Sequence, residues 1–474
     1  MPLILPGNVA SALGGGYEVA NSCRFNDGDS AYMHKTNGST GSQTTWTFSC
    51  WVKRGALGTQ QDIFACLDDT SNYTHLRIKS DDTVELDNIS GGSNTARLTT
   101  NRKLRDVGAW YNLVWVADTT NGTAGDRIRL YINGTEETSF GTDTQPSSSA
   151  SLFLNQNKKH TLGRNEYSSG SSYFDGYLAE VCFIDGTALT ATSFGEFDED
   201  SPTIWKPKDV SGLTFGTNGF YLDFEDSSNL GNDANGGTDF TEVNLAATDQ
   251  STDTPTNNFC TINPLDKSLT GTAATYSEGN LRFSSSGNSS SNNGTRCTFG
   301  ASNGKWYWEV LNVQNAFLFG IQDADAATRF TSSWTYDLTG TYAVKYDGEK
   351  SINATETGSA ISTFTDDDIL MMAMDLDNQK LYFGKNGTWD NSGDPTSGAT
   401  GTGSLGDLVS GTTYIPVLSN AHWSQNTIAD FNFGSPSFAI SSGNADGNGY
   451  GNFEYAVPSG YLALCTKNLG SDGG

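Results

Sequence analysis

The stretch Trp46-Thr-Phe-Ser-Cys-Trp-Val-Lys53 decides the fold class, because apolar and polar residues alternate along most of it. Successive side chains of a β-strand point to opposite faces of the sheet. The alternation therefore places Trp46, Phe48, Cys50 and Val52 on one face. We expect this face to line the core of a β-sheet protein.

The same pattern recurs through both halves of the chain. Further strands are expected over 110–116, 127–132, 177–184, 305–311, 317–321, 342–346, 369–376, 380–384, 414–418 and 428–433. Asn133-Gly134 and Asp185-Gly186 follow two of these stretches and predict hairpin turns, because these residue types tolerate positive φ. Helical signals are limited to 189–195. Short strands with frequent turn signals predict sandwiches or barrels.

Charge and cysteine content exclude several classes of protein. The 474 residues contain 27 Lys and Arg against 54 Asp and Glu, a formal net charge of -27. A phosphate backbone and an anionic membrane would both be repelled, so we expect no nucleic acid partner and no membrane insertion. No apolar run approaches the ~20 residues that span a bilayer, and residues 1–7 lack the basic region of a signal peptide. Seven widely spaced cysteines predict reduced, mostly buried thiols.

Two regions resemble known families. Residues 23–205 resemble a laminin-G-like, concanavalin-type jelly roll through five segments in order, which are 25–32, 46–52, 110–115, 130–134 and 174–184. Residues from about 260 to 466 resemble a SPRY domain, a β-sandwich used for binding, through 304–310, 319–321, 368–377, 381–387, 414–417 and 430–434. The tandem as a whole is similar to marine bacteriophage virion proteins that are described as tail-fibre-like or structural.

These resemblances imply an all-β fold of two tandem concanavalin/jelly-roll-type antiparallel β-sandwiches. We expect an N-terminal attachment segment over 1–22 and the laminin-G-like jelly roll over 23–205. An irregular connector packed on the sandwiches follows over 206–259, and the SPRY-like sandwich occupies 260–474.

No enzyme is expected from the motifs. None of the four histidines lies in a recognised nucleophile or zinc motif. Concanavalin-type folds include glycoside hydrolases with an ExDxE strand, and the nearest match is Glu85-Leu-Asp-Asn-Ile89. Ile89 occupies the position of the third acidic residue, so no residue supplies the second carboxyl group that hydrolysis needs. We interpret this stretch as an exposed hairpin strand.

Calcium is the one cofactor that the resemblance implies, because laminin-G-like domains often carry one Ca²⁺. Hard cations take several oxygen ligands from loops, and the candidate ligands are Asp27, Asp29, Asp118 and Asp126. Other acidic loops lie at 68–69 and 196–200. A solvated carboxylate is the alternative interpretation at each position.

Tryptophans are the remaining recognition candidates. Trp51 shares a strand face with Lys53 and is expected to reach the surface. Trp334, Trp389 and Trp423 lie in or beside loops of the second domain, and SPRY domains recognise ligands with a loop-built face. We therefore predict ligand binding by these three residues. A rim or inter-domain core position is the alternative for each tryptophan.

The favoured hypothesis is a structural component of a bacteriophage virion, as a tail-fibre or receptor-binding protein that attaches to a host-surface glycan or protein. Its expected partners are other virion proteins and copies of itself, with a trimer suggested by the family. The expected location is the virion. The alternatives are a capsid-decorating protein, a carbohydrate-active enzyme and a cellular SPRY adaptor.

Overall fold

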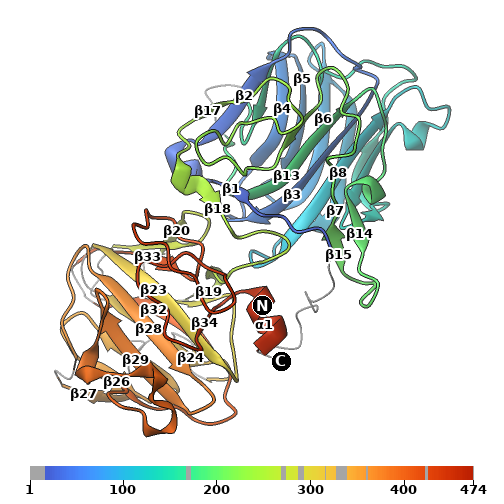
Figure 1. Cartoon of the computed structure of the whole chain (residues 1–474). Coiled ribbons are helices and arrows are strands. Elements are labelled where there is room, and N and C mark those ends of the chain that lie inside the picture. The colour runs from blue at the N-terminus through green and yellow to red at the C-terminus, as the bar shows by residue number, and fades with distance from the viewer. Residues whose placement is uncertain are drawn as a thin grey trace. The chain divides into compact units, whose positions relative to one another are not determined.

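The computed structural model describes residues 16–166, 172–267, 274–286, 293–314, 317–326, 339–358, 361–421 and 425–472 (Figure 1). The chain divides into two compact units between Thr256 and Asn257. Both units consist of β-sheets whose strands, in the described part of the chain, pair antiparallel with one parallel exception. The prediction of an all-β fold with tandem antiparallel sandwiches is confirmed. Most of the predicted attachment segment, residues 1–15, lies outside the described residues.

The first unit is a sandwich of two sheets, each with eight strands among the described residues. In spatial order, the first sheet contains β10 (Thr135–Glu136), β9 (Ile128–Ile132), β8 (Trp110–Asp118), β3 (Thr45–Arg54), β13 (Gly176–Asp185), β1 (Ser22–Phe25) and β18 (Gln250–Ser251), with β16 (Phe220–Leu222) paired to β13. The second contains β11 (Phe140–Thr144), β7 (Ser93–Lys103), β6 (Thr83–Ser90), β5 (Asn72–Ile78), β4 (Gln61–Asp69), β12 (Lys159–Leu162), β2 (Tyr32–Thr36) and β17 (Thr241–Val243).

The alternation in β3 produces the core between these sheets. Trp46, Phe48, Cys50 and Val52 are all buried in one cluster with side chains of the second sheet, as predicted. The ring of Phe48 stacks on that of Phe64 in β4, with 4.8 Å between centroids. Burying each such side chain contributes roughly 1.5–3 kcal/mol, so aromatic pairs between the two sheets stabilise the sandwich.

The other face of the first sheet is covered as well, which the sequence did not predict. Trp51 and Lys53 are buried, so the expectation that Trp51 reaches the surface is wrong. The covering cluster includes Phe194, Val210 and Phe215, which come from the chain that follows β13. Because this later segment packs over β3, the face of β3 that carries Trp51 and Lys53 lies inside the protein.

The segment predicted as an irregular connector supplies several elements of the first unit. Its strands β16, β17 and β18 extend the two sheets. The hairpin of β14 (Gly195–Phe197) and β15 (Trp205–Pro207) precedes most of this segment. Short 3-10 turns complete the unit at η1 (Asp27–Asp29), η2 (Ala124–Asp126), η3 (Ala191–Ser193) and η4 (Ala247–Asp249).

The second unit contains two further sheets. One runs β19 (Ile262–Lys267), β22 (Gly294–Cys297), β32 (Tyr414–Asn420), β24 (Phe317–Asp323), β25 (Thr341–Lys345), β26 (Lys350–Ile352) and β27 (Thr355–Thr357). The other runs β20 (Thr275–Ser277), β21 (Arg282–Ser285), β33 (Thr427–Asn432), β23 (Lys305–Gln314), β28 (Ile369–Asp375), β29 (Lys380–Lys385) and β30 (Thr388–Trp389), with β31 (Gly406–Asp407) paired to β29 and β34 (Leu462–Ala463) to β23. The turns η6 (Asp390–Ser392) and η7 (Pro395–Thr400) and the helix α1 (Thr466–Asp472) complete it.

Aromatic side chains also fill the core of the second unit. Trp306 and Trp308 of β23 are fully buried together with Phe319 of the facing sheet. The ring centroids of Phe319 and Phe383, from β24 and β29, lie 5.9 Å apart. All seven cysteines of the chain are buried and free, as predicted.

Candidate functional site

A charged layer on the second sheet of the first unit is the candidate functional site. Leu76, Leu86 and Leu98 of β5, β6 and β7 lie in the core. Side chains at alternate positions therefore face away from the core. We call this set the arginine face, and it comprises Asp62, His75, Arg77, Lys79, Glu85, Asp87 and Arg97. The strands that carry it are labelled β4 to β7 in Figure 1.

Strand register brings opposite charges together on the arginine face. Arg77 pairs with Glu85 across β5 and β6, and Asp87 pairs with Arg97 across β6 and β7. Arg77 Nε donates to Glu85 Oε1 at 2.9 Å, and Arg97 donates to both oxygens of Asp87 at 3.2 and 2.9 Å. Burial by itself lowers the pKa of Arg97, but the hydrogen bond and the charges of Asp87 and Glu85 raise it overall.

The remaining groups complete a continuous network. Glu85 Oε2 accepts from the Thr99 hydroxyl at 2.6 Å, and Lys79 Nζ lies 3.6 Å from the same oxygen. His75 Nδ1 lies 3.0 Å from Asp62 Oδ1. Because each carboxylate has several donors, the network is a rigid layer that holds its charged groups in fixed positions.

This geometry corrects one prediction about Glu85 and Asp87. They lie in β6, an interior strand with β5 and β7 on either side, and both side chains are buried. The interpretation as an exposed hairpin strand is therefore wrong. The alternation of Glu85 and Asp87 was visible in the sequence, but their arginine partners come from other strands. Only sheet pairing shows that the carboxylates are paired with arginines.

A second group of polar aromatic residues lies on the same sheet at β2. Tyr32 and His34 alternate with the core residue Met33, so they face outward. The Arg164 guanidinium lies 4.2 Å from the Tyr32 ring centroid and 5.5 Å from that of Tyr173. Half-buried rings with a cation beside them can contact a sugar or an apolar side chain. No sequence motif identified this group.

The predicted tryptophan site is described at one of its three positions. Trp389 belongs to β30 and is half-buried, with its ring 6.4 Å from that of Tyr307 in an edge-to-face arrangement. Trp334 and Trp423 lie outside the described residues. Ligand binding by these three residues stays a prediction.

The predicted calcium ligands lie in two separate turns. Asp27 and Asp29 belong to η1, where Asn26 Nδ2 donates to Asp29 Oδ2 at 2.8 Å. Asp118 ends β8 and accepts from the Thr120 hydroxyl, while Asp126 lies in η2. Among the described residues, no group of three or more His, Cys, Asp and Glu side chains is placed to hold a metal ion. Calcium binding stays a prediction, which titration calorimetry with Ca²⁺ and a chelated control would check.

A buried carboxyl group lies on the first sheet, outside the arginine face. Glu180 occupies a β-bulge in β13 with a φ of 50°, a conformation that is costly for a residue with a Cβ. The Tyr17 hydroxyl donates to Glu180 Oε2 at 3.1 Å, and the Tyr221 hydroxyl lies 3.0 and 2.9 Å from the two oxygens. Burial raises the pKa of Glu180 to about 7, and the tyrosine hydrogen bonds only partly offset it.

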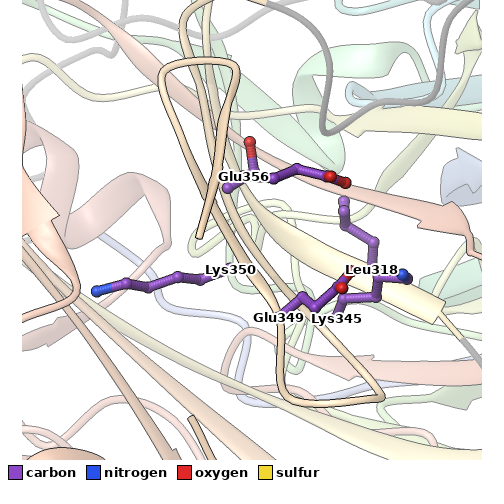
Figure 2. A pocket seen from close by; sticks show the side chains of 6 residues that line it. Leu318, Lys345, Glu349, Lys350 and Glu356 are labelled. Carbon is purple, nitrogen blue, oxygen red and sulfur yellow. Dashed lines mark hydrogen bonds and ion pairs between the residues drawn. The ribbon is translucent and has the colours of Figure 1, made fainter. Parts of the chain in front are cut away.

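A hollow in the second unit is lined by Leu318, Lys345, Glu349, Lys350, Ser351 and Glu356 (Figure 2), and it encloses no space large enough for a water molecule. Small-molecule pockets are usually about 300–1,000 Å³. Lys345 Nζ lies 2.7 Å from Glu349, and Lys350 Nζ donates to the Leu405 carbonyl oxygen at 2.8 Å. The hollow is therefore small, and protein groups already bind its ammonium groups.

Most of the first unit is similar to a known family of domains. Residues 26–193 match a laminin-G family model described as the concanavalin A-like lectin/glucanases superfamily. This match supports the predicted resemblance of residues 23–205 to a concanavalin-type jelly roll. A comparison with curated proteins gives no match. None of the helices in the described residues is long and apolar enough to cross a membrane.

Several solved structures are similar at low identity. The SPRY domain of human HERC1 is 15% identical, with 36% of this chain and 96% of that chain covered and a TM-score of 0.28. A heptameric SAP-like pentraxin of Limulus polyphemus is 16% identical, with 37% and 80% covered and a TM-score of 0.26. A protein of Bacteroides ovatus, provisionally assigned to carbohydrate binding, is 17% identical, with 48% and 58% covered and a TM-score of 0.33.

Proposed function

We propose that this protein binds glycans through the arginine face of its first unit and catalyses no reaction on them. The observation that carries the proposal is the rigid polar layer on a concanavalin A-like domain. Sugars are recognised by fixed donors and acceptors beside aromatic rings, and the arginine face and the Tyr32 group provide both. Binding of this kind needs no cofactor.

The arrangement of Glu85 and Asp87 supports binding in preference to hydrolysis. Glycoside hydrolysis needs one carboxyl group as acid and a second as base or nucleophile, both in contact with the substrate. Here both carboxylates are buried and ion-paired with Arg77 and Arg97, and position 89 is isoleucine. A reducing-sugar assay on bacterial surface polysaccharides checks this. Turnover that disappears in Glu85→Gln would establish an enzyme instead.

The biological setting that we propose is a bacteriophage virion, with this protein as a tail-fibre or receptor-binding component. Support comes from the resemblance of the tandem to marine phage virion proteins. Other virion proteins would be its partners, and a homo-oligomer, a trimer in such fibres, would convert weak sugar contacts into avidity. A capsid-decorating role is the second candidate, because the same resemblance extends to structural proteins of the particle.

Binding to cells tests the proposal directly. We expect labelled protein to bind to cells within a panel of marine bacteria and to compete with phage adsorption to them. Polysaccharide released from the same cells should inhibit binding. Protein that binds no cells and no polysaccharide, but binds empty capsids, would support the decorating role and refute the receptor role.

A further inference from the structure

The charges of the arginine face are arranged in two levels. The side chains of Glu85 and Asp87 are 1% and 2% exposed, whereas those of Lys79 and Arg97 are each 34% exposed. The carboxylates therefore form the lower, buried layer of this face, and the ammonium and guanidinium groups lie above them and reach solvent. A ligand that approaches this face meets cations first, although the chain carries a net charge of -27.

The two cations also keep unused hydrogen-bond donors. Arg97 donates hydrogen bonds from Nε and Nη2 to Asp87, and a guanidinium has five N–H groups in all. Its Nη1 makes no hydrogen bond within the described part of the chain. Lys79 Nζ lies 3.6 Å from Glu85 Oε2, which is ion-pair distance but too long for a hydrogen bond. Both side chains are partly exposed, so a ligand can use these donors without breaking the layer beneath.

Lys79 and Arg97 are close enough to act on one ligand group. Glu85 Oε2 lies 3.6 Å from Lys79 Nζ and 3.9 Å from Arg97 Nε, so the two cations flank a single oxygen. The Asp87 and Thr99 contacts hold Arg97 and Glu85 in place and reduce the entropy lost on binding.

We propose that the ligand of the arginine face is an acidic glycan, whose carboxylate or sulfate groups bind Arg97 and Lys79. This inference rests on the proposed function and specifies its ligand class. Planar guanidinium groups suit anionic oxygens, and such charge-assisted hydrogen bonds are roughly twice as strong as neutral ones. The negative field of the whole chain opposes a densely charged polymer such as DNA more than a polysaccharide with one charge per sugar.

Calorimetry on the full chain tests the inference with four probes: an oligouronate, a sulfated galactan oligosaccharide, a neutral β-glucan oligosaccharide of equal length, and single-stranded DNA. We expect the oligouronate or the sulfated probe to bind at least tenfold more tightly than the neutral glucan, and DNA not to bind. The two acidic arms distinguish carboxylate from sulfate. Affinity should fall as salt concentration rises, because exposed charges are screened.

Variants locate the site. Arg97→Gln and Lys79→Gln should each weaken acidic-probe binding about tenfold, as expected for a lost charge-assisted hydrogen bond. Arg129→Gln is the matched control, because Arg129 belongs to β9 of the other sheet, and its affinity should be unchanged. Lys79 lies at the exposed end of the layer, so Lys79→Gln remains informative if Arg97→Gln does not fold.

The results distinguish failure of the acidic-glycan inference from failure of glycan binding as a whole. Equal binding of neutral and acidic probes, or unchanged affinity in both variants, would overturn the acidic-glycan inference while glycan binding stands. Absence of binding to all three glycans, and to the cells of the adsorption experiment, would overturn the proposed function and this inference together. Tight DNA binding would show that the face selects charge density, which also refutes the inference.

Discussion

Glu180→Gln tests whether burial shifts the pKa of a carboxyl group inside the first unit. The Glu180 carboxyl is buried among Tyr17 and Tyr221, with Asp223 and Glu225 as acidic neighbours. Desolvation favours its neutral form and raises its pKa from 4.5 to about 7. Glutamine has nearly the same shape and cannot ionise, so the variant removes the titration, while its amide can accept from one tyrosine hydroxyl and donate to the other.

The sign of the effect follows from the direction of the shift. Because the folded-state pKa is above the unfolded value, the stabilisation is present below about pH 4.5 and is lost as the pH rises through about 7. Between about pH 5 and about pH 8, this group alone should lower the unfolding free energy of the wild-type protein by roughly 2–3 kcal/mol. We expect Glu180→Gln to lack that loss and to be the more stable protein at the higher pH.

Hydrogen exchange measured by mass spectrometry provides the assay, because peptides from β13 report on the first unit alone. Urea titrations at the two pH values give the change in free energy for the wild type and the variant. Glu199→Gln is the control, because Glu199 is an exposed residue of the first unit and is not among the charges that shift the pKa of Glu180. Equal pH dependence in wild type and Glu180→Gln would show that burial does not shift the pKa of Glu180 into this range.

Three further substitutions test buried contacts. Asp253→Ala removes the carboxylate that lies 2.6 Å from buried Lys53, so the unfolding free energy measured in urea should fall by about 3–5 kcal/mol. A fall below about 1 kcal/mol would contradict a buried ion pair. Trp308→Ala should lower the unfolding free energy of the second unit by about 3–5 kcal/mol. The unfolding transition of the first unit, followed by tryptophan fluorescence, should be unchanged. Gly134→Ala adds a Cβ at a φ of 76° against the Trp205 ring, so calorimetry should show a lower Tm.

Local sequence patterns determined the strands and their buried faces. The alternation in 46–53 placed Trp46 and Phe48 in the core, and Asn133-Gly134 adopts the positive φ values of a hairpin turn. These features depend on the period of two along a strand and on the conformations open to single residues. Both are properties of neighbouring residues, so the sequence is sufficient to predict them.

The arginine face, the burial of Trp51 and the raised pKa of Glu180 were decided by the tertiary structure. Alternation shows which way a side chain points, but it does not show which strand lies beside it or which later segment covers it. Arg77 and Arg97 reach Glu85 and Asp87 only because β5, β6 and β7 pair in one register. Trp51 is buried because chain more than 100 residues later packs over it. Contacts of this kind arise from long-range pairing, and local periodicity does not determine them.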